Sequence, residues 1–288
     1  MANSSHTPPL LQVEDLRVRF TSADGSVADA VRNVSFTLGR EKLGIVGESG
    51  SGKSTVGRAL LGLHPRSATI DAKTLAFSGI DLLNADAKTM RSIRGRRMSM
   101  ILQDPKYSLN PVLRVGDQIA EAYLAHHPGS KAQARAQVLA MLSAVRIRDP
   151  ERVYELYPHQ VSGGMGQRIM IAMMLVPQPE VMIADEPTSA LDVSVRMQVL
   201  DVLDELVTQR GLGLIFISHD LNLVRHFCDR VLVMYAGRVV ESIAAADLAN
   251  ARHPYTQGLL AALPSMQHRR PILPTLQRDP AWAQGATA

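Results

Sequence analysis

The chain has 288 residues, of which 46% are hydrophobic and 20% charged, a balance typical of a folded globular protein and not of a disordered one. Its longest unbroken apolar run, residues 169–176, is far shorter than the roughly 20 residues that a membrane-spanning helix needs. The net charge of +4 permits attraction to anions, but only 4% of the residues are aromatic, so we expect no nucleic-acid partner. The single Cys228 excludes an internal disulfide and a cysteine-based metal site.

The first third of the chain predicts two kinds of β-structure. Apolar residues alternate along residues 10–38, with a turn-prone segment at residues 21–25, and this pattern indicates an antiparallel layer. Residues 42–46 form a short apolar strand, residues 47–52 a glycine-rich turn, and residues 54–63 a helix that ends before a proline.

Further along the chain, apolar strands alternate with helices. Strands are predicted at residues 98–102, 181–184 and 212–217, and helices at 115–145 with a break at 127–129, at 162–175, and around residues 195–206. This alternation favours an α/β fold with a largely parallel central sheet. The composition changes after residue 239, and we expect residues 264–288 to be poorly ordered.

The strongest chemical motif lies between the strand at 42–46 and the helix that follows it. It fits the phosphate-binding pattern G-x-x-x-x-G-K-[ST], in which backbone N–H groups, a helix N-terminus and a lysine surround phosphate oxygens and a hydroxyl faces Mg²⁺. A flexible glycine turn is the alternative, but the strand and helix on either side favour the phosphate loop. The predicted nucleotide-binding residues are Gly47, Glu48, Ser49, Gly50, Ser51, Gly52, Lys53, Ser54 and Thr55.

Two further motifs follow. The strand at 181–184 ends in Asp185 and Glu186, which places two carboxylates at the carboxyl end of a parallel sheet. There Asp185 is placed to hold Mg²⁺ through water, and Glu186 to act as general base toward an attacking water. Ser162 precedes Gly163 and Gly164 at the start of an apolar helix, where it is either a simple cap or part of an anion-binding turn.

The ordered set of motifs resembles the ATP-binding cassette (ABC) ATPases across nearly the whole chain. The matching positions are Walker A at 47–54, the Q-loop at Gln103, the signature at 162–165, Walker B at 181–186, the D-loop at 189–192 and the H-loop at His219. The resemblance implies a P-loop, RecA-like parallel core with an antiparallel β layer and a helical subdomain. We therefore expect a nucleotide-binding domain over 1–263, with the helical subdomain inserted at about 104–165.

The resemblance also assigns roles to single residues, with ATP and Mg²⁺ as the cofactors. Phe20 falls where the family stacks an aromatic ring on adenine, although a strand phenylalanine is as easily explained by the core. Mg²⁺ would be held by Ser54, Gln103 and Asp185. Catalysis would involve Glu186, His219 at the γ-phosphate and Gln103. In the family, two cassettes pack head to tail, so Ser162, Gly163, Gly164 and Asp192 would contact the nucleotide of the other subunit.

Segments 108–111, 157–160 and 253–264 resemble the oligopeptide, dipeptide and nickel branch of ABC importers, although Met165 and Gly166 depart from its usual signature. The resemblance implies an ATPase subunit at the cytoplasmic face of the inner membrane. Its partners would be a second ATPase subunit, either a different chain or another copy, two transmembrane permease subunits and an extracytoplasmic substrate-binding protein. The alternatives are a soluble ABC ATPase of translation or DNA repair and, less favoured, a P-loop kinase or GTPase.

Overall fold

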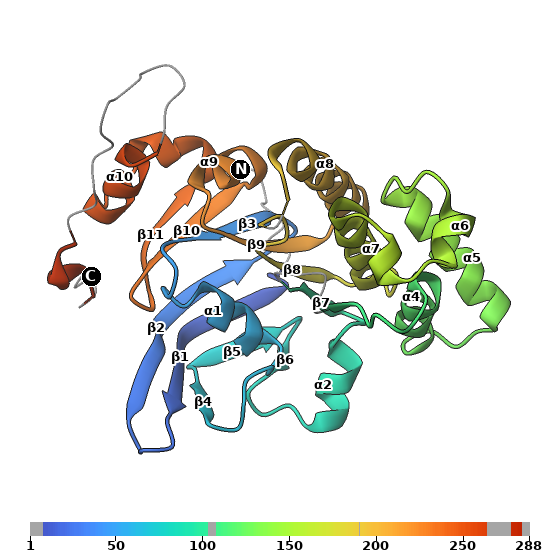
Figure 1. Cartoon of the computed structure of the whole chain (residues 1–288). Coiled ribbons are helices and arrows are strands. Elements are labelled where there is room, and N and C mark those ends of the chain that lie inside the picture. The colour runs from blue at the N-terminus through green and yellow to red at the C-terminus, as the bar shows by residue number, and fades with distance from the viewer. Residues whose placement is uncertain (1–7, 103–107, 190, 264–277, 284–288) are drawn as a thin grey trace, which may run out of the picture. The chain divides into compact units, whose positions relative to one another are not determined.

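The computed structural model describes residues 8–102, 108–189, 191–263 and 278–283 (Figure 1). They form two compact units. The first unit contains the chain up to Asn84 together with the part from Phe216 onward, and the second unit contains residues from Ala85 to Ile215. Each unit contains part of the predicted site.

An antiparallel layer of the first unit is built on two long strands, β1 and β2, which pair from Leu11 opposite Leu38 to Thr21 opposite Val27. Their inward residues are buried and apolar and most of their outward residues are polar, which confirms the alternation expected over residues 10–38. Strands β4 and β5 pair with the other side of β1, and β6 pairs with β5. The strands are β1 (Leu11–Thr21), β2 (Val27–Leu38), β4 (Ala68–Asp71), β5 (Thr74–Phe77) and β6 (Ile80–Asp81).

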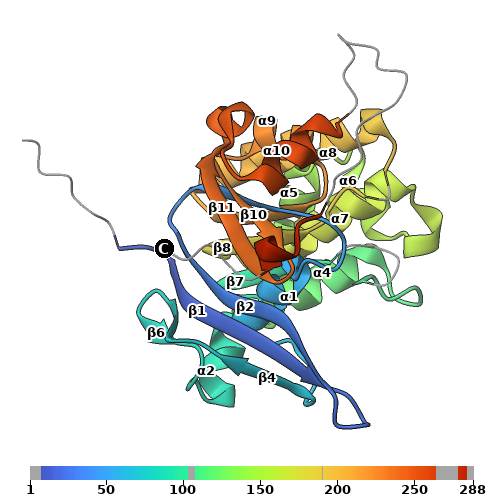
Figure 2. The same cartoon turned by 90° about the vertical axis from the view of Figure 1, so that its left-hand side faces the viewer.

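The first unit also contains a parallel strand pair, of which β10 is labelled in Figure 2 together with β1 and β2 of the antiparallel layer. Strand β3 pairs in parallel with β10, and β10 continues through a tight turn into antiparallel β11. Helix α1 begins at Lys53 but ends at Leu60, earlier than predicted, because Gly62 adopts a left-handed φ of 59°. These elements are β3 (Lys42–Val46), α1 (Lys53–Leu60), α9 (Leu221–Phe227), β10 (Arg230–Tyr235), β11 (Arg238–Ala244), the 3₁₀ helices η2 (Ala245–Asn250) and η3 (Pro280–Ala283), and α10 (Pro254–Ala261).

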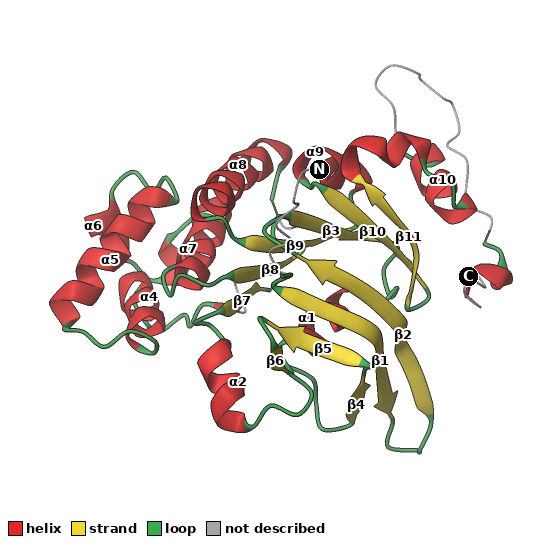
Figure 3. Ribbon diagram, turned by 180° about the vertical axis from the view of Figure 1, so that it is seen from behind, coloured by secondary structure: helices red, strands yellow, loops and turns green. Residues whose placement is uncertain are grey.

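The second unit contains helices around a buried parallel pair of strands, β7 and β8, in register from Met98 opposite Val181 (Figure 3). Helices α7 and α8 lie side by side, and α4, α5 and α6 pack together. Ser130 caps α5 in a capping box, which explains the predicted break before it. The elements are α2 (Ala87–Ile93), β7 (Met98–Ile101), α4 (Val115–Leu124), α5 (Lys131–Ala144), α6 (Pro150–Tyr154), η1 (Pro158–Gln160), α7 (Gly163–Leu175), β8 (Val181–Asp185) and α8 (Val193–Arg210).

Strand β9 (Gly213–Ser218) completes the set, and the boundary between the units falls within it. The parallel strands, the antiparallel layer and the helices confirm the predicted α/β fold class. Across the described part of the chain, no helix combines the length and the apolar character that a bilayer crossing requires.

The packing of α4 against α6 gives a stability prediction. A Cβ added to Gly116 would lie 2.1 Å from Cγ of the buried Tyr154 ring, so Gly116→Ala should lower the free energy of unfolding by about 1–3 kcal/mol. The matched control is Gly39→Ala, since a Cβ there meets nothing within 4 Å. Urea unfolding of both variants measures the difference. A Gly116→Ala variant as stable as the parent would contradict this close packing.

Candidate nucleotide-binding and catalytic site

The phosphate loop of the first unit connects β3 to α1 and is tightly curled. Lys53 is only 6% exposed, and its ammonium donates hydrogen bonds to the carbonyl oxygens of Gly47 and Glu48, each at 2.8 Å. Burial of an ammonium is costly unless polar partners surround it, so these carbonyl groups hold Lys53 inside the loop. The loop therefore presents a positive charge at the start of a helix, as anion binding requires.

Close packing around the loop requires glycine at its ends. Gly52 has a φ of 97°, and a Cβ on it would lie 2.5 Å from the carbonyl oxygen of Ala30 in β2. A Cβ on Gly47 would lie 2.1 Å from the carbonyl oxygen of Met234 in β10. Larger residues would push the loop away from both strands.

One buried hydroxyl of this loop indicates that it fits a ligand. The Oγ atom of Ser51 is buried and makes no hydrogen bond within the described part of the chain. A buried polar atom without a partner is unfavourable and is common where a ligand supplies the missing bond. The phosphate loop thus offers a curled backbone, a lysine and an unsatisfied hydroxyl to an anionic group.

Two further predicted site residues, Phe20 and His219, lie in the first unit. Phe20, near the end of β1, is half-buried, and its ring meets that of His64 edge-on at 5.6 Å. A ring nitrogen of His64 lies 3.0 Å from the carbonyl oxygen of Thr55 in α1, so Phe20 is connected to the helix that follows the phosphate loop. His219 directly follows β9 and is exposed.

His64 was not predicted as part of the site. Burial lowers the pKa of its imidazole and outweighs the hydrogen bond with the Thr55 carbonyl, which raises it, so the neutral ring is favoured. A pairing between a strand aromatic and a histidine after a helix depends on tertiary packing, for which the sequence contains no local signal.

The acidic pair lies in the second unit. Strand β8 is buried along its length, and Asp185 at its end is 3% exposed. Glu186 follows with a φ of 47°, a left-handed conformation that is rare for a residue with a side chain. Such strained positions concentrate at functional sites, and a hydrogen bond from the Ser189 amide to the Glu186 carbonyl closes the turn.

The signature residues and the D-loop residue come together in the second unit. Ser162 caps α7 by accepting a hydrogen bond from the Met165 amide, and Asp192 caps α8 by accepting one from Val195. The Val195 amide is also the main cause of the lowered pKa of Asp192. Gly163 and Gly164 line the same hollow of about 290 Å³ as these two caps.

A single glycine allows this approach of α7 to α8. A Cβ on Gly164 would lie 2.5 Å from a methyl group of Val195, so only glycine fits without movement.

Gln103, the remaining predicted site residue, lies outside the described residues. No group of three or more His, Cys, Asp or Glu side chains forms a metal site in the part of the chain that the structure describes.

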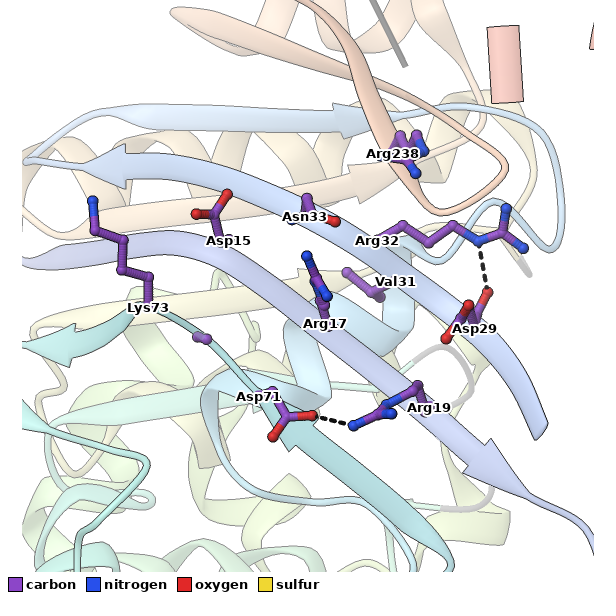
Figure 4. Close-up of a pocket in the computed structure, with 11 residues that line it drawn as sticks. Asp15, Arg17, Arg19, Asp29, Val31, Arg32, Asn33, Asp71, Lys73 and Arg238 are labelled. Atoms are coloured by element: carbon purple, nitrogen blue, oxygen red, sulfur yellow. Dashed lines mark hydrogen bonds and ion pairs between the residues drawn. The ribbon is translucent and has the colours of Figure 1, made fainter. Parts of the chain in front are cut away.

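A hollow of about 770 Å³ in the first unit lies elsewhere, over the outward face of β1 and β2 (Figure 4). Its cationic residues are partly neutralised: Arg19 pairs with Asp71 at 2.6 Å, and Lys73 with Glu14 at 3.3 Å. None of the predicted site residues lines it. We name it the basic hollow, and its cationic residues are Arg17, Arg19, Arg32, Lys73 and Arg238.

Comparisons with known proteins agree with this geometry. The family model described as ABC transporter matches residues 31–189. The chain belongs to the ABC transporter family. It is 47% identical over 260 residues to the dipeptide transport ATP-binding protein DppD of Bacillus subtilis, covering 89% of this chain and 77% of that protein. It is 45% identical over 273 residues to the oligopeptide transport ATP-binding protein OppD of Salmonella typhimurium, covering 94% and 81%.

Solved ABC structures show the same fold. A dimeric ATP-binding cassette bound to ADP and phosphate has a TM-score of 0.73 at 24% identity, covering 82% of this chain and 98% of that one. CbiO1 of Clostridium perfringens, part of an ABC transporter complex, has a TM-score of 0.71 at 24% identity, covering 84% and 91%. The chain is thus an ATPase subunit of the ABC transporter family, and the soluble-ATPase alternative is not favoured.

The phosphate loop gives the most direct prediction for this ABC subunit. Lys53→Ala should weaken ATP binding at least about tenfold, because a buried charge-assisted contact to the phosphates is lost. Lys73→Ala is the matched control, since this exposed lysine lies in the basic hollow. Calorimetric titration with ATP measures both. Unchanged affinity in the Lys53 variant would rule out the assignment of the phosphate loop.

Proposed function

We propose that this ABC subunit hydrolyses ATP to energise the import of peptides or a related small solute. Two observations together support this proposal. The phosphate loop has a buried hydroxyl, that of Ser51, without a hydrogen bond among the described residues, and the chain is similar to proteins named for dipeptide and oligopeptide transport. The substrate class comes from those relatives.

The first unit would bind the nucleotide. The backbone N–H groups of the phosphate loop and the Lys53 ammonium would bind the phosphates, and the half-buried ring of Phe20 would stack on adenine. Ser54, Asp185 and Gln103 would hold Mg²⁺, either directly or through water. When bound, the metal neutralises charge on the phosphate oxygens.

The second unit would supply the base. The Glu186 carboxylate would accept a proton from water as the water oxygen attacks the γ-phosphorus and the bond to the ADP oxygen breaks. The left-handed backbone at Glu186 is a strained conformation of the kind that concentrates at functional sites. The imidazole of His219 would hold the γ-phosphate in line for the attack.

The signature hollow indicates how subunits would pair. Gly163, Gly164 and the Ser162 cap at the start of α7 form a helix N-terminus that can bind an anion. We infer that it contacts the ATP of a second ATPase subunit in a head-to-tail dimer, a different chain or another copy. Two permease subunits and an extracytoplasmic binding protein would complete the complex, with this chain on the cytoplasmic face of the membrane.

Exchange of the proposed base separates binding from hydrolysis. Glu186→Gln keeps the shape of the side chain but removes the base, so ATP turnover should fall about 10²–10⁴-fold while ATP affinity stays unchanged. Glu151→Gln, on the exposed side of α6, is the matched control. Turnover of the Glu186 variant within a factor of two of the parent would refute its role.

A second measurement tests the coupling to transport. ATP turnover of the isolated chain should be slow, because the signature and the phosphate loop act across a subunit interface. Turnover should rise in membranes that contain the permease subunits, and rise again with peptide-loaded binding protein. If the isolated chain already hydrolyses ATP as fast as the stimulated complex, the transport proposal fails.

A further inference from the structure

The last described segment, residues 278–283, packs against the rest of the first unit through a cluster of aromatic rings. The Trp282 ring in η3 lies 5.9 Å from the rings of Tyr235 and Tyr255 and 6.0 Å from that of His253. Tyr235 and Tyr255 themselves are 4.7 Å apart. In Figure 2, the short η3 helix, in dark red, lies over the β10–β11 hairpin. Such ring contacts bury apolar surface and favour a defined position of the segment.

Two side chains of this region reach one residue of the phosphate loop, Glu48. The hydroxyl oxygen of Tyr255, a fully buried residue of α10, accepts a hydrogen bond from the Glu48 amide at 3.1 Å. The guanidinium of Arg278 donates to the Glu48 carboxylate at 3.0 Å. Burial raises the pKa of Tyr255 to about 12, so its hydroxyl stays neutral beside this carboxylate at physiological pH.

Glu48 connects these contacts to Lys53. Its carbonyl oxygen accepts hydrogen bonds from the Lys53 ammonium at 2.8 Å and from the Ser51 amide at 3.2 Å. The same residue is therefore held at its N–H by Tyr255, at its carboxylate by Arg278 and at its carbonyl by the phosphate loop. A shift of Glu48 would displace the groups that hold the buried lysine in place.

We propose that Tyr255, Arg278 and Trp282 form a brace that holds Glu48, and through it Lys53, in the position that binds phosphate. The proposal rests on the proposed function, because it assumes that a nucleotide binds at this loop. Tyr255 and Arg278 are positioning residues. If the packed brace increases the affinity for nucleotide, then bound nucleotide must stabilise the packed position of the brace by the same free energy.

Removal of the Tyr255 hydroxyl, a change of one oxygen atom, tests whether its hydrogen bond with Glu48 supports nucleotide binding. Tyr255→Phe keeps the ring but removes the acceptor for the Glu48 amide, and it should weaken binding of Mg²⁺-ATP to the full chain about threefold to tenfold. Tyr235→Phe is the matched control, because its ring belongs to the same cluster and its hydroxyl has no hydrogen bond among the described residues. A purely structural cluster would respond equally to both changes.

The exposed ion pair gives a second, independent test. Arg278→Gln should weaken Mg²⁺-ATP binding about twofold to fivefold at low ionic strength, with a smaller effect at high salt, and Arg278→Lys should restore part of it. Arg252→Gln is the control, since its exposed side chain forms no hydrogen bond or ion pair among the described residues. Because Arg278 is on the surface, its variants should fold even if Tyr255→Phe does not.

Trp282 provides a direct readout of the docked state, because it is the only tryptophan of the chain. Its fluorescence should be more readily quenched by acrylamide in the Arg278→Gln variant. Addition of Mg²⁺-ATP should reduce quenching in the parent chain but not in Lys53→Ala.

The combined results separate the two proposals. If Lys53→Ala loses ATP binding while Tyr255→Phe and Arg278→Gln bind as tightly as their controls, the brace is wrong and the nucleotide site remains. If Lys53→Ala binds ATP normally, the proposed site itself is wrong. Weakened binding in both brace variants, normal binding in both controls and ATP-dependent protection of Trp282 would establish the brace.

Discussion

The buried ammonium of Lys53 is the constraint on which the rest of the site depends. A lysine that is 6% exposed must exchange water for protein oxygen atoms, and the carbonyl groups of Gly47 and Glu48 supply them. These bonds curl the loop so closely against Ala30 and Met234 that a side chain at Gly47 or Gly52 would collide with their carbonyl groups. One buried charge thereby fixes the loop, its glycines and the neighbouring strands.

The other predicted site residues lie at the ends of secondary-structure elements. Asp185 and Glu186 follow a buried strand, and Ser162 and Asp192 each cap a helix while lining one hollow. In this arrangement the rigid elements are apolar and the chemistry is confined to their ends, which explains how an ABC cassette can be stable and still present strained residues such as Glu186.

Much of this was predictable from the sequence, because its causes are local. The phosphate loop, the cap of α7 and the strand before Asp185 each depend on a few adjacent residues, and the structure places these elements at the expected positions. The roles of the individual residues stay predictions, including that of Gln103, which lies outside the described residues. The contacts of Glu48 could not be foreseen, since its partners Tyr255 and Arg278 are 207 and 230 positions away along the chain. Segment 253–264 resembles one branch of importers, but this resemblance predicts no role for Tyr255.

Hydrogen–deuterium exchange of the full chain, with and without Mg²⁺-ATP, tests most directly whether nucleotide binds at the phosphate loop. We expect slower exchange in peptides that cover residues 47–55, and little change at residues 71–73, which line the basic hollow. Protection confined to peptides that line the basic hollow, with unchanged exchange at residues 47–55, would contradict this expectation.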